Sequence, residues 1–236
     1  MADPKEELRQ FEQMRASSQY ARFTDRPVAY FCTEYALSAG QKLYAGGLGV
    51  LAGDMVREVG DRAFPFVAVG LYYREGYYCQ SKEVGGRMME ICTATPPERA
   101  GFEPVLDARG ERVHVAVPVH DRIIQVRAWK LKDRGAQVYL MDTDCEENSP
   151  EDQRITDRLY VGDKETRLKQ EIVLGIGGLR LLEALDIHPS LYHLNEGHSA
   201  LLALELIRHE MRERHIGYDE AKQFARRRIV MTNHTL

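Results

Sequence analysis

The sequence lacks the features that mark several classes of protein. No stretch of about 18 or more apolar residues occurs, so no membrane-spanning helix is predicted. Residues 1–20 are polar and lack the apolar core of a secretory signal. The net charge is −4, so the composition gives no reason to expect nucleic acid as a partner. These absences argue against a membrane protein and against a nucleic-acid-binding protein.

Motifs for disulfides, metals and hydrolysis are absent too. The sequence has four cysteines, none in a CxxC pair, which in a chain of this size favours free thiols and a cytoplasmic location. The eight histidines include no HExxH motif and no cluster with cysteine, so no metal site is predicted. No GxSxG elbow is present, which argues against a Ser/His/Asp hydrolase.

The length of 236 residues suits one large α/β domain or two small ones. Residues 5–18 have the composition of a polar helix, so we assign residues 1–25 to an N-terminal helical extension. Residues 26–236 are assigned to one α/β domain. Its start predicts a buried strand at 27–33, a helix at 46–60 and a strand at 66–71, a βαβ unit of the kind that builds parallel sheets.

The middle of the chain predicts an antiparallel β insertion at about residues 85–140. Residues 111–119 alternate polar and apolar, so one face of that strand is expected to be wet. Residues 122–131 and 136–141 also look extended. The polar residues 143–162 predict a long loop, and long loops inside compact domains are often functional.

The α/β pattern resumes after this loop. We predict helices at 163–186, 197–212 and 218–227, and strands at 191–194 and 228–232. Helical spacing gives each of three helices an inward face. The predicted inward residues are Leu48, Leu51, Ala52, Met55, Val56 and Val59, then Leu168, Ile172, Ile176 and Leu179, then Ala200, Leu204, Ile207 and Met211. Interior glycines at 175, 177 and 178 are expected to allow close packing on another backbone.

A glycine-rich turn opens the first helix of the βαβ unit. Gly46 and Gly47, followed by Leu48, let the backbone approach a ligand closely, and the free amides and the helix dipole favour an anion. The spacing is neither GxGxxG nor a P-loop, so nucleotide binding by those modes is not supported. The alternative is a turn needed only for chain reversal.

Polar residues also follow two later strands. Asn195, Glu196 and His198 come directly after residues 191–194, and Asn233 and His234 follow the last strand. Ligands bind at the carboxyl ends of strands in open α/β sheets, so both clusters are candidate site residues. The alternatives are helix capping by the first cluster and an ordinary polar loop for the second.

Two further features have more than one interpretation. Glu34 follows the first strand, where a carboxylate can anchor the glycine loop, bind a substrate hydroxyl or lie on the surface. The tyrosines at 72, 73, 77 and 78 suit either stacking on sugars or packing at a sheet edge, and packing is favoured.

Many segments in the same order resemble α-glucan phosphorylases, which act on glycogen, starch or maltodextrin. The similarity runs from about Val28 to the end and is closest in character to the shorter bacterial and archaeal members. The matching segments are residues 44–54, 69–77, 139–144, 148–152, 155–160, 165–171, 193–198 and 232–235.

The resemblance implies a GT-B fold of two Rossmann-like domains with a cleft between them, of which this chain is the N-terminal half. It implies release of glucose 1-phosphate from α-1,4-glucan and inorganic phosphate, with retention. The cofactor is pyridoxal 5′-phosphate, held by a lysine of the C-terminal domain whose motif this sequence does not contain. We therefore expect the isolated chain to be inactive and its partner to be that missing domain; a homo-oligomer stays open.

The resemblance also assigns roles to the glycine loop. It implies that the amides around Gly46, Gly47 and Leu48 face the substrate phosphate and the sugar ring. Glu34 matches the acidic residue of the family near this loop, and we include it among the sugar-binding candidates.

The strand-end clusters receive roles in the same way. His234 matches the histidine whose carbonyl lies near the anomeric carbon, where it favours developing positive charge, and whose ring meets the sugar 6-hydroxyl. Asn195, Glu196 and His198 match the cluster that lines the β-side of the glucose pocket, although muscle-type members carry aspartate where this chain has Glu196. Asn233 is grouped with these sugar-binding candidates.

Two alternative functions remain. Glycogen and starch synthases share the architecture but carry a lysine beside their glycine loop, as Lys-x-Gly-Gly-Leu. Here that place is taken by Tyr44, with Lys42 two residues earlier, which disfavours a synthase. The other alternative is a carbohydrate-binding or partner module without turnover of its own.

Overall fold

The computed structural model describes residues 6, 9 and 23–234, with the exception of residues 39, 79, 84, 91 and 134. The polar helix predicted over residues 5–18 lies outside the described residues apart from Glu6 and Arg9. No helix in the described part of the chain is long and apolar enough to cross a membrane.

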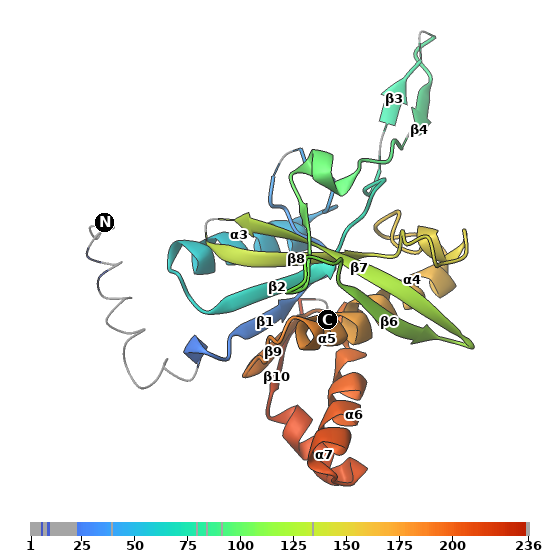
Figure 1. The fold of residues 1–236 in the computed structure, drawn as a ribbon. Coiled ribbons are helices and arrows are strands. Elements are labelled where there is room, and N and C mark those ends of the chain that lie inside the picture. Colours follow the sequence, from blue (N-terminus) through green and yellow to red (C-terminus); the bar gives the residue numbers. More distant parts are fainter. Residues whose placement is uncertain are drawn as a thin grey trace.

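Within the described residues, eight strands form one central sheet in the order β10-β9-β1-β2-β8-β7-β5, with β6 paired to β7 (Figure 1). The parallel strands are β1 (Val28–Phe31), β2 (Phe66–Leu71), β8 (Ala136–Asp142), β9 (Leu191–Asn195) and β10 (Ile229–Thr232). The chain proceeds outward from β1 through β2 to β8 and then returns to β9 and β10 on the other side of β1. This is the strand order of a doubly wound fold, and the order reverses between β1 and β9.

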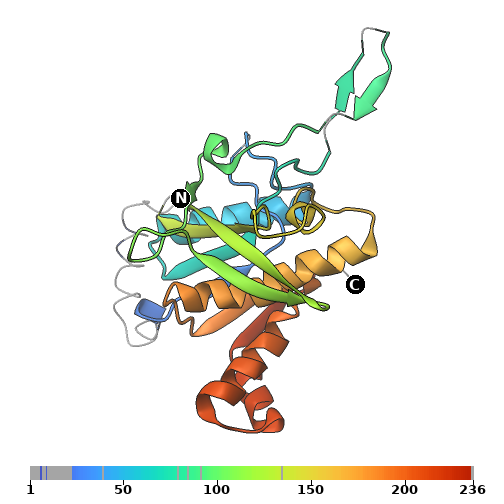
Figure 2. The same ribbon diagram turned by 45° about the vertical axis from the view of Figure 1, so that its right-hand side comes forward.

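The antiparallel part of the sheet is built around the long strand β7 (Arg122–Asp133). It pairs antiparallel with β5 (Glu103–Pro104), with β6 (His114–Val119) and with β8. Exposed and buried residues alternate along β6, as predicted. The predicted antiparallel insertion is wrong in one respect, because β8 also pairs in parallel with β2 and is mostly buried, so it belongs to the parallel sheet. A separate hairpin, β3 (Gln80–Lys82) and β4 (Met88–Glu90), projects from the body of the molecule (Figure 2).

Helices cover both faces of the sheet. Because side chains alternate along a strand, Tyr30 packs with Val56 of α3 (Gly47–Asp61), whereas Phe31 packs in the core that includes Leu179 and Leu206 on the other face. That second face carries α4 (Lys164–Ile172), α5 (Gly178–Ala184), α6 (Leu202–Arg214) and α7 (Tyr218–Arg226). Short 3₁₀ turns lie at η1 (Pro97–Ala100), η2 (Asp152–Arg154) and η4 (Gly197–Ser199).

The single helix predicted over residues 163–186 is interrupted by a π-helical turn, η3 (Val173–Gly177). The expectation that its glycines allow close packing is confirmed at Gly175, where a Cβ atom would lie 2.7 Å from the backbone nitrogen of Leu202. The predicted inward face is wrong at Leu168, which is exposed.

The predicted inward face of α6 is largely wrong. Ile207 is buried, but Ala200, Leu204 and Met211 are exposed. The helix begins only at Leu202, after the 3₁₀ turn, so its buried face is rotated relative to the prediction.

Two carboxylates lie on the buried face of α6. Glu205 accepts hydrogen bonds from Arg180 and Arg208, and Glu210 pairs with Arg214 and Arg228. Burial alone raises the pKa of such a carboxyl, but the hydrogen bonds from arginine outweigh it, and the pKa of both glutamates is lowered.

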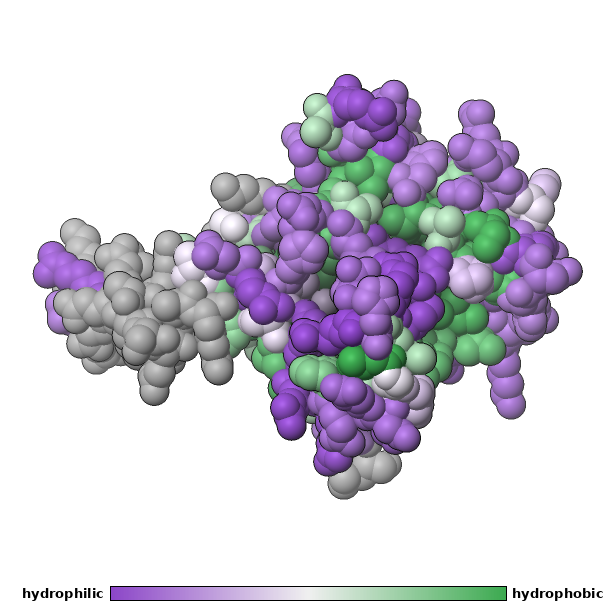
Figure 3. All heavy atoms as spheres, turned by 60° about the horizontal axis from the view of Figure 1, so that its bottom comes forward, coloured by the Kyte–Doolittle hydropathy of each residue, from purple (hydrophilic) through white to green (hydrophobic). Residues whose placement is uncertain are grey.

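The end of the molecule that carries α6 and α7 comes forward in Figure 3, where the surface is mainly hydrophilic.

Candidate functional site

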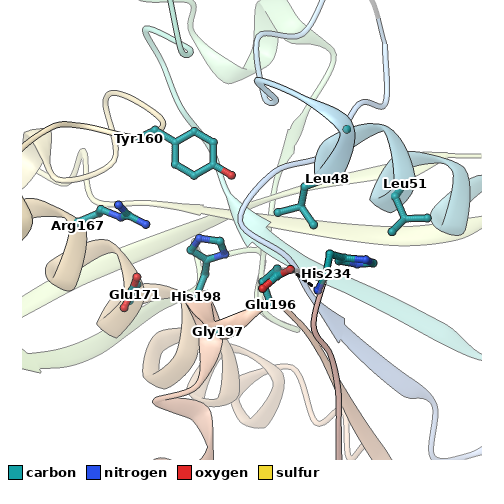
Figure 4. Close-up of a pocket in the computed structure, with 10 residues that line it drawn as sticks. Leu48, Leu51, Tyr160, Arg167, Glu171, Glu196, Gly197, His198 and His234 are labelled. Carbon is teal, nitrogen blue, oxygen red and sulfur yellow. Dashed lines mark hydrogen bonds between the residues drawn. The ribbon is translucent and has the colours of Figure 1, made fainter. Parts of the chain in front are cut away.

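A pocket of about 700 Å³ lies at the carboxyl ends of β1, β9 and β10 (Figure 4). Its position is the point where the strand order reverses, between β1 and β9, at which doubly wound folds bind their ligands. The lining residues come from three regions: the start of α3, the segments after β9 and β10, and α4 with the loop before it. They are Gly47, Leu48, Leu51, Tyr160, Arg167, Glu171, Glu196, Gly197, His198 and His234.

Glu34 holds the glycine loop from behind the pocket. Its carboxylate is 2% exposed and accepts the backbone N–H of Ala45 at 2.5 Å and of Gly46 at 3.3 Å. The hydroxyl of Tyr160 donates to the other carboxylate oxygen at 2.8 Å. Of the three interpretations of Glu34, the structure therefore shows the loop anchor, and Glu34 does not line the pocket.

The first turn of α3 faces the pocket with Gly47 and Leu48. The preceding Gly46 is the N-cap and supplies no side-chain cap, and the first turn contains no acidic residue. No described atom accepts a hydrogen bond from the amides of Gly47 and Leu48. Free amides at the positive end of a 15-residue helix make this turn suited to bind an anion.

The predicted inward face of α3 is wrong at Leu51, which is 43% exposed and lines the pocket. The helix instead buries a face rich in glycine, because α3 lies very close to the chain that follows β1. A Cβ atom on Gly53 would overlap the carbonyl oxygen of Ala36. Leu48 and Leu51 are therefore turned toward the pocket, where they form an apolar wall (Figure 4).

The segments after β9 and β10 are joined by hydrogen bonds to His234. The Glu196 carboxylate accepts the backbone N–H of His234 at 2.6 Å, and the side-chain oxygen of Asn195 lies 3.1 Å from its ring Nε2. Asn195 is buried and donates to the Tyr30 hydroxyl at 2.6 Å, so it positions His234 from behind the pocket wall. Asn233 is exposed and does not line the pocket.

Glu196 has an unusual backbone conformation, with a φ of +65° and a ψ of −176°. Residues other than glycine rarely adopt this region, at a cost of about 1–3 kcal/mol, and they do so mainly at functional sites. Its amide donates to the Thr232 carbonyl at 2.9 Å, which joins the ends of β9 and β10. This backbone conformation places the Glu196 side chain at the pocket, where its carboxylate also accepts the His234 amide.

The third wall contains residues that the sequence pattern did not single out as site residues. Arg167 and Glu171 lie four residues apart on α4, which begins after Asp163, whose carboxylate accepts the Thr166 amide at 2.8 Å. Tyr160 comes from the end of the preceding loop. Two features of the sequence pointed toward these residues. The long loop before α4 was expected to be functional, and Arg167 and Glu171 have the spacing that puts two charges on one face of a helix.

The charges of this wall are poised for a polar ligand. Among the described residues, no carboxylate forms an ion pair with Arg167. Burial lowers the pKa of His198 below 6.5; Glu171 opposes this shift and Arg167 adds to it. Burial raises the pKa of Tyr160, and so does its hydrogen bond to Glu34. The pocket thus presents two imidazoles, one guanidinium and two carboxylates, and burial favours the neutral form of His198.

The arrangement suits a ligand with several hydroxyls and an anionic group. The α3 amides and Arg167 can bind the anion, while Glu171, Glu196 and His198 can exchange hydrogen bonds with hydroxyls. Within the described ranges, no group of three or more His, Cys, Asp and Glu residues is arranged to hold a metal ion.

Comparison with known proteins gave no matching family model but several similar proteins. The chain is 39% identical to the maltodextrin phosphorylase of Thermococcus litoralis over 219 residues, which are 93% of this chain and 26% of that protein. Identity to the glycogen phosphorylase of Mycobacterium tuberculosis is 37% over 88% of the chain and 25% of that protein. Identity to the glycogen phosphorylase of Aquifex aeolicus is 35% over 94% of the chain and 32% of that protein. The chain thus spans about a quarter to a third of the length of these relatives.

Proposed function

Because the chain is homologous over about nine tenths of its length to maltodextrin and glycogen phosphorylases, we propose that it forms the N-terminal, substrate-side domain of an α-glucan phosphorylase. In this proposal the complete protein has the GT-B architecture and releases glucose 1-phosphate from α-1,4-glucan and inorganic phosphate, with retention. Its location is the cytoplasm, which the cysteine usage favours.

The observation that carries the proposal is the meeting of two walls at the point of strand reversal. The free amides of Gly47 and Leu48 stand on one side, and Glu196, His198 and His234 stand on the other. This juxtaposition provides an anion site next to hydrogen-bonding groups for a sugar, as phosphorolysis requires.

The residues of this chain have separate tasks in the proposed reaction. The Gly47 and Leu48 amides bind phosphate oxygens, and Glu196 and His198 bind glucose hydroxyls. His234 is held at two points, its backbone N–H by Glu196 and its ring by Asn195. That fixed position lets its carbonyl dipole favour positive charge at the anomeric carbon without reorganising during the reaction.

Pyridoxal 5′-phosphate, which the resemblance implies, does not fit as a covalent ligand of this pocket. Its aldehyde requires an amine, and none of the residues that line the pocket is a lysine. In the proposal the cofactor is therefore held by a lysine in a C-terminal domain, as the resemblance implies.

The alternatives are less well supported. A synthase requires a lysine beside the glycine loop, and Tyr44 occupies that place. One observation favours the second alternative, in which the chain by itself is a glucan-binding module: its pocket offers sugar-binding groups but no amine for the cofactor.

An NMR titration of the isolated chain tests the proposal. Inorganic phosphate should shift the amide signals of Gly47 and Leu48, and maltoheptaose should shift those of His198 and Gly197. Replacing Glu196→Gln should weaken the maltoheptaose shifts, whereas Glu103→Gln, on the exposed edge strand β5, should leave them unchanged. The chain alone should form no glucose 1-phosphate. Signals that move only at surface residues away from the pocket would refute the proposed site.

A further inference from the structure

Two exposed tyrosines next to the pocket lie outside the hydrophobic core. Of the four tyrosines between residues 72 and 78, Tyr72 and Tyr73 are buried, and their hydroxyls bond to Thr95 and Thr33. For these two, packing rather than stacking on sugars is confirmed, although they pack in the core directly after β2 and not within a strand. Tyr77 and Tyr78 instead are 47% and 56% exposed. A single exposed tyrosine needs no explanation, but adjacent exposed rings beside a pocket are typical of ligand-binding surfaces.

The exposed tyrosines continue the aromatic lining of the pocket outward. The Tyr160 ring lies 6.2 Å from the His198 ring inside the pocket, centroid to centroid. On its outer side the Tyr77 ring meets Tyr160 edge to face, at 6.0 Å and 86°. Tyr78 follows at 6.4 Å from Tyr77. The four rings form a row from the pocket wall to the outer surface, and Figure 4 shows its inner end, with Tyr160 opposite Leu48.

The backbone holds this row in place. The Glu75 amide donates to the Asp157 carbonyl at 2.8 Å, and the Leu159 amide donates to the Gly76 carbonyl at 2.9 Å. Gly76 has a φ of +74°, which glycine adopts without strain, and a Cβ atom there would lie 2.6 Å from the side chain of Lys42. Tyr77 therefore starts from a fixed turn, so ordering it around a ligand costs little.

The chemistry of the surface points to sugar rings. A pyranose presents a flat face of C–H groups bordered by hydroxyls, which matches an exposed tyrosine ring with its own hydroxyl at the rim. An α-glucan whose end occupies the pocket extends its remaining glucose units over the neighbouring surface. We propose that Tyr77 and Tyr78 form a stacking platform for glucose units of the α-glucan that lie outside the pocket. The proposal rests on the proposed function, because that function supplies the polymeric substrate.

Affinity electrophoresis of the chain in gels containing soluble starch tests the platform. The wild-type chain should be retarded, and Tyr77→Ala with Tyr78→Ala should raise the apparent dissociation constant about tenfold, since each stacked ring contributes modestly. The Tyr77→Phe, Tyr78→Phe variant keeps the rings and should bind like wild type. Tyr218→Ala removes an equally exposed tyrosine on α7 and should have no effect.

The outcomes separate the platform from the proposed function. Unchanged retardation of the double alanine variant, folded as shown by its urea midpoint, would overturn the platform. If gel filtration in addition shows the wild-type chain as a dimer and the double alanine variant as a monomer, the surface is an interface between two copies. A wild-type chain that starch does not retard would also overturn the platform. None of these results decides the reaction class, which is tested separately by a hybrid enzyme that carries this chain in place of the matching segment of a known phosphorylase.

Discussion

Glu34 is the residue on which the position of the glycine loop depends most. One buried carboxylate accepts the amides of Ala45 and Gly46 on one oxygen and the hydroxyl of Tyr160 on the other. It therefore joins the start of α3 to the opposite wall of the pocket. We predict that Glu34→Ala destabilises the chain and loosens the loop, and that Glu34→Gln does so much less.

The magnitude follows from the donors that lose their acceptor. A buried donor left unsatisfied costs about 1–3 kcal/mol. Ala45 and Gly46 are exposed, so water can reach their amides in the alanine variant, whereas the Tyr160 hydroxyl is less accessible. The Tyr160 hydroxyl then costs about 1–3 kcal/mol, and exchanging the two loop hydrogen bonds for bonds to water costs about 1 kcal/mol, so a total loss of about 2–4 kcal/mol in the free energy of unfolding is expected for Glu34→Ala. In Glu34→Gln the amide oxygen can still serve the loop and the NH₂ can donate to Tyr160, so the expected loss is about 1 kcal/mol.

Urea unfolding of the 236-residue chain measures these losses, and hydrogen exchange at residues 44–49 reports the loop itself. Exchange there should accelerate in Glu34→Ala more than in the rest of the chain. Glu103→Ala is the control, since its side chain is 77% exposed and its carboxylate only approaches Lys130 at 3.9 Å. Losses below about 0.5 kcal/mol for Glu34→Ala, equal to those of the control, would refute the anchoring role.

Three further predictions concern packing and charge. Gly53→Ala should lower the free energy of unfolding by about 1–3 kcal/mol in urea, because its Cβ meets backbone, whereas Gly162→Ala, with open space around it, should be near neutral. Arginine contacts lower the pKa of Glu205 and Glu210, so the stabilisation that these two carboxylates provide is fully present above about pH 4.5 and is lost as the pH falls through the lowered pKa values. Urea midpoints measured between pH 3 and pH 7, at roughly unit steps, should show this loss, and a midpoint that does not change with pH would contradict it. NMR titration of His198 should give a pKa below 6.5, because burial disfavours its charged form, and a value above 6.5 would mean that the pocket is wetter or more acidic than described.

The strands and the parallel sheet were predictable because short apolar runs alternate with helical patterns, and that alternation favours βαβ units. The buried faces of the helices were less so. Apolar spacing placed Leu204 and Met211 inward, but α6 buries Glu205 and Glu210, and each of them meets an arginine from another segment as well as one from α6 itself. No local pattern shows that a glutamate will meet an arginine from a distant part of the chain.

The pocket was partly predictable for a geometric reason. Glu196, His198 and His234 follow strands that lie side by side, so their position at one edge of the sheet follows from the βαβ rule. Arg167 and Glu171 lie within a helix and do not directly follow a strand, so the rule that site residues follow the carboxyl ends of strands does not predict them. The interpretation of Glu34 stayed open because the fold of the glycine loop back onto it is a tertiary contact.

A hybrid enzyme tests the central claim most directly. Residues 28–234 of this chain replace the matching segment of the Thermococcus litoralis maltodextrin phosphorylase, and glucose 1-phosphate formed from maltodextrin and inorganic phosphate is measured. The account predicts that the hybrid forms glucose 1-phosphate, that His234→Ala lowers its turnover by about 10²–10³-fold, and that His188→Ala, an exposed histidine at the other end of the sheet, leaves turnover unchanged. A folded hybrid that binds pyridoxal phosphate but forms no product, or one in which His234→Ala turns over normally, would contradict it.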